Sequence, residues 1–254
     1  MIAIRCSDEI EKIAESARIV GGALRLAQGL LAEGLTTRDL DAEIEKYIRS
    51  RDATPSFKGY GGFPASACIS INEVVVHGIP SDRKLQQGDV VGVDVGAYKN
   101  GYHGDGAWTF PVGEVSAETE RLLTVAQKAL IRGIEKARVG ARLGEIGHAV
   151  QSHAESHGFS VVRALVGHGI GTQLHEEPQV PNFGQPNEGP ILAAGMVMAI
   201  EPMINIGGPD VRTEKDGWTV VTRDRSLSAH FEHTVAVTEN GPRVLTCPGP
   251  GDPG

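Results

Sequence analysis

Hydrophobic positions near the start of the chain predict two consecutive helices. Apolar residues recur at helical spacing over residues 10–31 and again over residues 40–48. Ser7 is a suitable N-cap for the first helix, and Gly34 is placed to end it. Thr36, followed three residues later by an acid, resembles a capping box for the second helix. We therefore expect a helical pair in this part of the chain.

The same order of elements returns after residue 115. Ser116 can cap a helix that Gly140 ends, and a second helix follows over residues 143–157. Loops rich in glycine and proline are expected over residues 54–66 and 176–190. Short apolar runs predict strands over residues 68–71, 74–77, 159–166, 191–206, 218–221 and 231–237.

A hairpin is predicted over residues 90–110, which read VVGVDVGAYKNGYHGDGAWTF. Asn100 and Gly101 both tolerate the positive φ angles of a two-residue turn. With that turn, Asp94 and Asp105 lie on the same sheet face as diagonal neighbours, about 7–8 Å apart or less. Two carboxylates on an otherwise apolar face repel each other and lose hydration. The hairpin therefore requires a shared proton or a cation.

Two stretches of the chain resemble each other. LQQGDVVGVDV aligns with LAAGMVMAIEP, which places Asp94 on Glu201, and the tripeptide HGI at His77 recurs at His168. We therefore predict one α+β domain over residues 1–248, built from pseudo-symmetric halves at about 7–115 and 116–240. Residues 249–254, rich in glycine and proline, are expected to form a disordered tail.

Composition excludes several classes of protein. The 254 residues carry a formal net charge of −8, which argues against a specific nucleic-acid-binding surface. No apolar run approaches the length of a membrane span, and the N-terminal residues do not resemble a secretion signal. The three cysteines are widely spaced, without a CxxC pair, and fit free thiols in a reducing cytoplasm.

Four acids stand in apolar surroundings. Glu201 in MVMAIEPMI and Glu232 in SAHFEHTVAV join Asp94 and Asp105, and no basic residue lies inside these predicted strands. A salt-bridged core therefore explains them poorly, because carboxylates are rarely buried unpaired. His168 lies in the glycine-rich GHGIG, which we interpret as a flexible functional segment, although a strand histidine is often only a core residue. Four carboxylates and one imidazole exceed a tetrahedral zinc site and suit two divalent cations in a hydrolase.

The motifs DVGAYKNGYHGD, GHGIGTQLHEEP, AIEPM and HFEHT occur here in the order and spacing of one peptidase family. From about Ser7 to Val244 the chain resembles the type I methionine aminopeptidases of peptidase family M24. The resemblance implies the pita-bread fold, an α+β fold of two pseudo-symmetric halves with antiparallel sheet and outer helices.

The resemblance also implies roles for particular residues. The metal ligands would be Asp94, Asp105, His168, Glu201 and Glu232, with Asp105 and Glu232 bridging two ions of Co, Mn, Fe or Zn. The residues that contact the substrate would be His77, His175, Tyr60, Phe63, Cys68, Leu174 and Trp218. Many family members have an aromatic residue in place of Leu174 and Tyr in place of Phe63, which bears on substrate preference. Trp218 and Cys68 are equally compatible with ordinary core packing. Neither His230 nor His233 receives a role.

The implied activity is removal of the N-terminal methionine from nascent proteins and peptides whose second residue is small. Glu201 would take a proton from water, His175 would donate to the substrate carbonyl oxygen, and His77 would contact the next amide. The implied partners are nascent polypeptide N-termini at the ribosome exit after deformylation. We expect a cytoplasmic monomer that binds neither membranes nor specific nucleic acids.

Three alternatives compete with this interpretation. A prolidase-like M24 peptidase has the same ligands but carries an additional N-terminal domain, for which the residues before Asp94 leave no room. A type II methionine aminopeptidase has a long insertion between the last two acids, which is missing between Glu201 and Glu232. A non-catalytic pita-bread protein that binds peptides or partners usually loses ligands, whereas all five are present here.

Overall fold

The computed structural model describes residues 1–246, so the predicted tail at residues 249–254 lies outside the described residues. The helices of the described chain are α1 (Ser7–Leu30), α2 (Thr37–Arg49), α3 (Ala117–Ile134) and α4 (Leu143–Ser156), with a short 3₁₀ turn η1 (Tyr60–Gly62). The strands of the first half are β1 (Thr54–Pro55), β2 (Ala67–Ile71), β3 (Val74–Val76), β4 (Val90–Lys99) and β5 (Tyr102–Pro111). The later strands are β6 (Ser160–Val161), β7 (Val166–Gly169), β8 (Glu176–Pro181), β9 (Val197–Ile200), β10 (Met203–Asn205), β11 (Val211–Thr213), β12 (Val220–Thr222), β13 (Ser228–His230), β14 (His233–Thr238) and β15 (Gly241–Val244).

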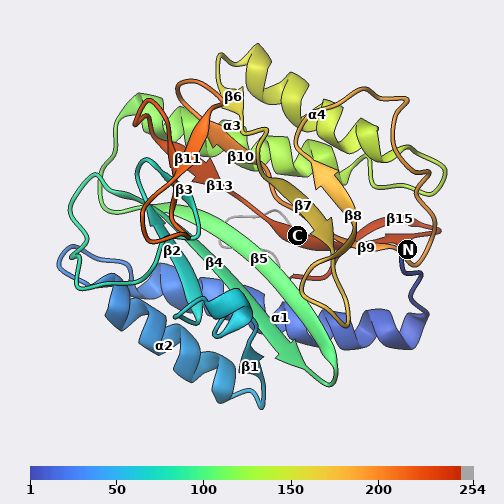
Figure 1. Cartoon of the computed structure of the whole chain (residues 1–254), viewed down its shortest axis with the longest axis horizontal. Helices are drawn as coiled ribbons and strands as arrows, with labels where there is room; N and C mark the ends of the chain where they lie inside the picture. Colours follow the sequence, from blue (N-terminus) through green and yellow to red (C-terminus); the bar gives the residue numbers. More distant parts are fainter. Residues whose placement is uncertain (247–254) are drawn as a thin grey trace.

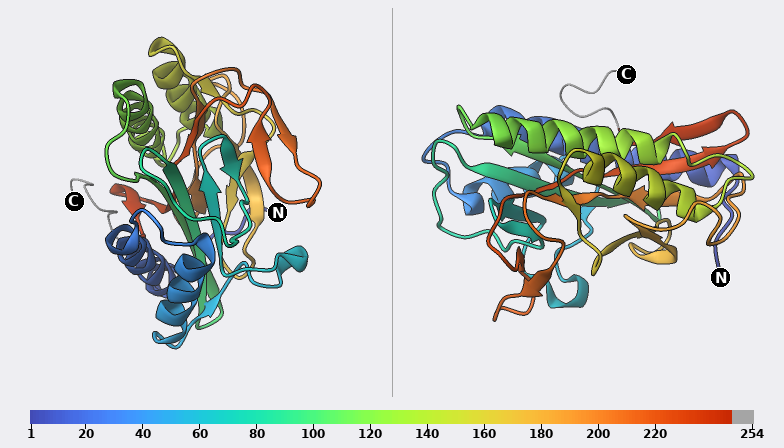
Figure 2. Two further views of the ribbon diagram at one scale, coloured as in Figure 1. Left: turned by 90° about the vertical axis from the view of Figure 1, so that its left-hand side faces the viewer. Right: turned by 90° about the horizontal axis from the view of Figure 1, so that it is seen from above.

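The helices lie on one side of the strands. In the face-on view of Figure 1, α1 and α2 lie near one edge of the strands and α3 and α4 near the opposite edge. Figure 2 shows both helical pairs on the same side, with the β11–β12 hairpin and η1 on the opposite side. The antiparallel strands form a sheet of β1, β4, β2 and β5, a sheet in the order β15-β14-β9-β7-β8, and two three-stranded sheets. These helices and antiparallel sheets confirm the predicted α+β architecture with outer helices. The pseudo-two-fold relation of the halves stays a prediction.

The predicted hairpin is confirmed residue by residue. Asn100 and Gly101 have φ angles of 52° and 88°, and the strands β4 and β5 pair from this turn outward. Asp94 lies opposite Ala107, which puts Asp94 and Asp105 on one face as diagonal neighbours. The local turn chemistry was sufficient to set this register.

The predicted N-caps of α2 and α3 are confirmed, whereas α1 differs from its prediction at both ends and α3 ends at Ile134, before the predicted Gly140. The Thr36 and Ser116 hydroxyls each accept a hydrogen bond from the backbone three residues ahead, as predicted. Ser7, however, is the first helical residue of α1, and Cys6 occupies the N-cap position. The same helix ends at Leu30 rather than at Gly34, because Leu31 already has an extended conformation.

Several strand and loop predictions were wrong in extent. The proline-rich loop at residues 176–190 contains β8, which pairs only with β7 and lies at the sheet edge, where prolines are tolerated. The predicted strand at residues 159–166 is divided between β6 and β7. The first three residues of GHGIG lie in β7, an interior strand of its sheet, rather than in an open loop. A Cβ atom at Gly167 would lie 2.4 Å from the Ala199 carbonyl oxygen, so this glycine permits close strand packing.

Glu201 and Glu232 lie between strands rather than inside them. Glu201 occupies the break between β9 and β10, and Glu232 the break between β13 and β14. The strands β9 and β14 pair with each other in one sheet, and β10 and β13 pair in another. Both acids therefore lie where two neighbouring chain segments pass together from one sheet to the next.

The close approach of α1 to β5 yields a stability prediction. A Cβ atom at Gly104 would lie 2.4 Å from the backbone nitrogen of Ala17, so α1 has to move away from the sheet in Gly104→Ala. We expect this variant to lose about 1–3 kcal/mol of unfolding free energy, measured by denaturant titration.

Gly29→Ala is the matched control. Gly29 lies in α1, the helix that Gly104 contacts, and an added Cβ atom there would have no neighbour within 4 Å among the described residues beyond its own stretch of helix. This variant should be unchanged or gain up to about 1 kcal/mol from helix propensity. Equal midpoints for Gly104→Ala and the unaltered protein would contradict the tight packing.

Candidate metal centre

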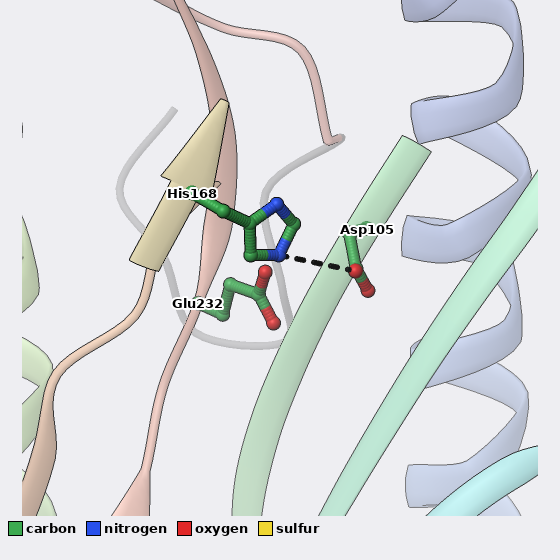
Figure 3. Close-up of side chains that lie close together, drawn as sticks. All are labelled: Asp105, His168 and Glu232. Carbon is green, nitrogen blue, oxygen red and sulfur yellow. Dashed lines mark ion pairs between the residues drawn. The ribbon is translucent and has the colours of Figure 1, made fainter. Parts of the chain in front are cut away.

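The five predicted ligands converge on one cavity from three strands and two breaks between strands. Asp94 comes from β4, Asp105 from β5 and His168 from β7, while Glu201 and Glu232 come from the two strand breaks. Figure 3 shows Asp105, His168 and Glu232 pointing toward one another. One ligand atom from each of these three residues lies within 4.8 Å of the others. Residues more than a hundred positions apart thus form one cluster.

The separations within the cluster are those of ligands around an ion rather than those of direct hydrogen bonds. His168 Nε2 lies 3.8 Å from Asp105 Oδ2 and 3.6 Å from Glu201 Oε1. Two donor atoms that are each about 2.1 Å from an ion are about 3–4 Å apart at ordinary coordination angles. The cluster therefore has room for a cation between its members.

Burial makes the ionised form of these acids costly. Burial, with the neighbouring carboxylates, raises the pKa of Asp105 and of Glu232 well above the usual range. Burial also raises the pKa of Asp94 to about 7 and the pKa of Glu201 to about 8. Among the described residues, those that line the cavity include no lysine or arginine. The missing positive charge has to be supplied by protons or by metal ions.

The donor atoms fit divalent cations. Asp94 Oδ1 and Glu232 Oε1 are buried and have no hydrogen-bond partner among the described residues. The Nδ1 atom of His168 lies 2.9 Å from the Gly169 carbonyl oxygen and can donate to it, which leaves Nε2 as a ligand facing the acids. Carboxylate oxygens with one imidazole suit ions such as Mn, Fe, Co and Zn.

Hydrogen bonds from β5 to Glu232 and to Thr234 of β14 hold Asp105 and Glu232 in place. Glu232 and Ala107 exchange backbone hydrogen bonds of 2.9 and 3.4 Å. The Thr234 hydroxyl accepts from the Asp105 backbone N–H and donates to its carbonyl, at 3.0 and 2.8 Å. We call these contacts the β5 seam. They fix Asp105 of β5 relative to Glu232, which lies in the break between β13 and β14.

An apolar pocket adjoins the acids in the same cavity, whose volume is about 140 Å³. Its apolar wall consists of Phe57, Tyr60, Phe63, Cys68, Leu174 and Trp218. Phe63 and Trp218 meet edge to face at 5.2 Å. Phe57, Phe63, Cys68 and Leu174 belong to a buried cluster that includes residues of α1, so the wall is part of the core. Every predicted site residue lines this cavity, and Phe57 is an addition that sequence reasoning left out.

Two further histidines face the cavity. His175 Nδ1 lies 2.7 Å from the Tyr60 hydroxyl, and its ring centroid is 4.3 Å from that of His168. His77 has a φ angle of 58°, an uncommon conformation for a non-glycine residue that marks a strained position. Burial, with His230 and His175 nearby, lowers the pKa of His77 to about 4, and burial lowers the pKa of His175. Both imidazoles are therefore neutral at physiological pH.

Two contacts beside the site were missed by sequence reasoning. His230 Nε2 lies 3.5 Å from Glu201 Oε2. The sequence held one signal for this contact: His230 is two residues before Glu232, and side chains two positions apart in a strand point to the same face. Arg5 donates to both oxygens of Glu176, at 2.7 and 2.6 Å, which anchors the loop that carries His175. No local pattern could have linked Arg5 to a residue so distant in the sequence.

Comparisons with known proteins agree with this site. The model of metallopeptidase family M24 matches residues 11–239. A methionine aminopeptidase of Clostridium acetobutylicum is 51% identical over 97% of this chain and 99% of its own length. The crystal structure of the methionine aminopeptidase from Thermotoga maritima superposes with a TM-score of 0.96 at 43% identity, over 98% of this chain and 100% of that one.

A more distant relative shares the architecture but not the full length. The prolidase from Pyrococcus furiosus has a TM-score of 0.80 at 25% identity, covering 97% of this chain and 66% of that one. The two nearer matches each cover almost the whole of both chains at more than 40% identity. This chain therefore belongs to metallopeptidase family M24 and, within it, to the methionine aminopeptidases.

Proposed function

We propose that this protein removes the N-terminal methionine from proteins and peptides whose second residue is small. The observation that carries the proposal is one cavity of about 140 Å³ in which an apolar wall adjoins four carboxylates and His168. A metal-dependent hydrolase needs the acids, and selection of one apolar side chain needs the pocket. Membership in metallopeptidase family M24 also implies that the protein uses divalent metal ions.

The pocket suits an unbranched thioether. Its wall combines aromatic rings with Cys68 and Leu174, and methionine sulfur makes favourable contacts with aromatic edges. Tyr60 is 45% exposed at the mouth, whereas Phe63 is 3% exposed deeper inside. A wall that belongs to the protein core deforms little, so larger side chains are excluded.

A second hollow of about 470 Å³ adjoins the pocket and shares four residues with it: His77, His168, His175 and Glu201. A substrate with its first side chain in the pocket can therefore extend past the acids into this hollow. The bond after the first residue then lies beside the two uncharged imidazoles. This arrangement favours cleavage of the first peptide bond rather than an internal one.

The chain's own groups have the following roles in the proposal. When bound by the five ligands, divalent ions would supply a Lewis acid and lower the pKa of a water molecule. Glu201 accepts the proton of the attacking water and passes it to the leaving amine. With the Tyr60 hydroxyl as the donor to His175 Nδ1, 2.7 Å away, the neutral ring would keep its proton on Nε2 for the carbonyl oxygen as negative charge develops there. His77 contacts the amide of the next residue.

The finer assignments also belong to this proposal. We infer that Asp94, Asp105, His168, Glu201 and Glu232 would together hold two divalent ions, and any of Co, Mn, Fe or Zn meets the donor chemistry. The substrates would be nascent chains that leave the ribosome after deformylation, so we infer a cytoplasmic enzyme acting as a monomer. None of the described helices is long and apolar enough to cross a membrane.

Turnover of defined peptides tests the proposal directly. We expect the purified protein to release methionine from Met-Ala, Met-Gly and Met-Ser peptides and little from Met-Lys or Met-Leu peptides. Excess chelator should abolish release, and elemental analysis should find up to two divalent ions per chain. Ala-Pro dipeptides, a prolidase substrate, serve as the negative control. Comparable rates on all peptides, or full activity without metal, would refute the proposal.

His175 and His168 are expected to separate chemistry from metal binding. His175→Ala should lower kcat by about 10²–10³, the usual effect of losing one donor to a developing oxyanion, with a smaller change in KM. Its metal content should stay unchanged, because His175 Nδ1 contacts Tyr60 and not an acid. His168→Ala should lose metal affinity as well as rate. Loss of metal in His175→Ala would show that these two roles are reversed.

The buried acids also predict how metal-free protein responds to pH. Folding raises the pKa of Asp94 to about 7 and the pKa of Glu201 to about 8. At pH values between the ordinary carboxyl pKa and these raised values, the folded state therefore binds more protons than the unfolded chain. Stability therefore falls as pH rises through this window. The buried histidines act in the opposite direction only below about pH 6.5.

Thermal unfolding in chelator should therefore occur at a lower temperature at about pH 8.5 than at about pH 6.5. With saturating Mn²⁺ the stabilisation by metal should grow over the same interval, because ligands must lose their protons to bind. Metal-free protein that gains stability across this interval would contradict the buried, unpaired state of the acids.

A further inference from the structure

His230 is a buried histidine that the proposed reaction does not use. It is 4% exposed and ends β13, two residues before Glu232. Its Nε2 atom has no hydrogen-bond partner within the described chain. An imidazole nitrogen enclosed in this way is costly unless something polar lies within reach.

The nearest acceptors are the carboxylates of the metal centre. His230 Nε2 lies 3.5 Å from Glu201 Oε2 and 3.9 Å from Glu232 Oε2. The other oxygen of Glu201 faces His168, at 3.6 Å. The Glu201 carboxylate is therefore flanked by an imidazole on each side. Without a proton, the lone pair of His230 Nε2 would repel the lone pairs of these carboxylate oxygens. With a proton, Nε2 can donate a hydrogen bond to them.

The backbone of His230 is held from two directions. Its N–H donates to Thr109 Oγ1 at 2.9 Å, and the same hydroxyl donates to its carbonyl oxygen at 2.7 Å. On the other side His230 pairs with Met203 of β10, two residues after Glu201. His230 is thus fixed both to β5 and to the segment that carries Glu201.

The position of His230 relative to the cavity defines its role. The described residues that line the cavity include Glu201 and Glu232 but not His230, which lies behind them. We propose that His230 is a positioning residue that donates from Nε2 to Glu201 Oε2 and so holds Glu201 in its metal-binding orientation. A closure of about 0.5 Å brings the pair to ordinary hydrogen-bond length.

This inference rests on the proposed function, since it gives Glu201 an outer partner at the metal centre. Such outer partners orient ligands, and their loss commonly costs about 10–100-fold in metal affinity or activity. Without the donor, the Glu201 carboxylate can rotate and its Oε1 no longer faces His168 consistently. We therefore expect the defect to appear first in metal affinity.

Two substitutions at one position distinguish hydrogen bonding from packing. His230→Leu fills the space without a donor, whereas His230→Gln keeps an N–H group of similar reach. We expect Co²⁺ titrated into the metal-free protein by calorimetry to bind His230→Leu about 10–100-fold more weakly than the unaltered protein, with His230→Gln retaining most of the affinity. His233→Gln is the matched control, because His233 is another buried imidazole beside Glu232, with Nδ1 2.7 Å from Thr246 Oγ1.

Each outcome has a defined meaning. Unaltered Co²⁺ affinity in His230→Leu, or equal losses in His230→Gln and His230→Leu, overturns the positioning role. An equal loss in His233→Gln does so too. X-ray absorption of the Co²⁺-loaded protein should count the same number of imidazole ligands in His230→Gln as in the unaltered protein, and a lower count would make His230 a ligand instead. If the unaltered protein itself neither binds Co²⁺ nor cleaves Met-Ala peptides, the proposed function fails, and this is seen before any variant is compared.

Discussion

The gathering of four carboxylates, two buried and two half-buried, at one point between the sheets is the constraint on which the rest of this structure depends. Asp105 and Glu232 are 3% and 2% exposed, and their neighbours in the cavity wall include no positively charged side chain among the described residues. A protein core tolerates such a group only with protons or cations to balance it. The hairpin and the two strand breaks bring the acids together, and the β5 seam holds them at a fixed separation. Function and folding thus place opposite demands on the same residues, because the arrangement that is costly without metal is the one that binds metal.

The wall of the pocket beside the acids is part of the hydrophobic core, so core packing determines which side chains fit the pocket. Phe63, Cys68 and Leu174 pack in one buried cluster with Ile13 and Ala17 of α1, so a change in pocket shape would disturb the contact between helix and sheet. The catalytic side is supported differently, by polar contacts. Tyr60 orients His175, and Arg5 anchors the same loop through Glu176. An apolar, rigid wall and a hydrogen-bonded loop therefore meet at one cavity, which separates selection of the side chain from the chemistry of the bond.

Local chemistry explains which predictions succeeded. The Asn100-Gly101 turn determines the pairing of β4 and β5 because only residues that tolerate positive φ allow that turn, and a two-residue loop leaves one register. The prediction that Glu201 and Glu232 lie inside strands was wrong, because each lies in a break between two strands. A continuous apolar run is compatible with one long strand or with two short ones in different sheets, and neighbouring strands decide between these possibilities. The glycines of GHGIG were misinterpreted for the same reason, because the close approach of Ala199 cannot be seen in the sequence.

By itself, the sequence determined the N-caps of α2 and α3, the hairpin and the presence of unpaired acids, since each depends on residues within a few positions of one another. Its motifs also identified the family, because order and spacing are properties of the chain. The tertiary structure alone decided which outer residues support the site. His230 faces Glu201, Phe57 enters the pocket wall, and Arg5 reaches Glu176 through packing between distant segments. Such contacts arise when sheets and helices bury their apolar faces against each other, and periodicity along one segment carries no information about the partner that it meets.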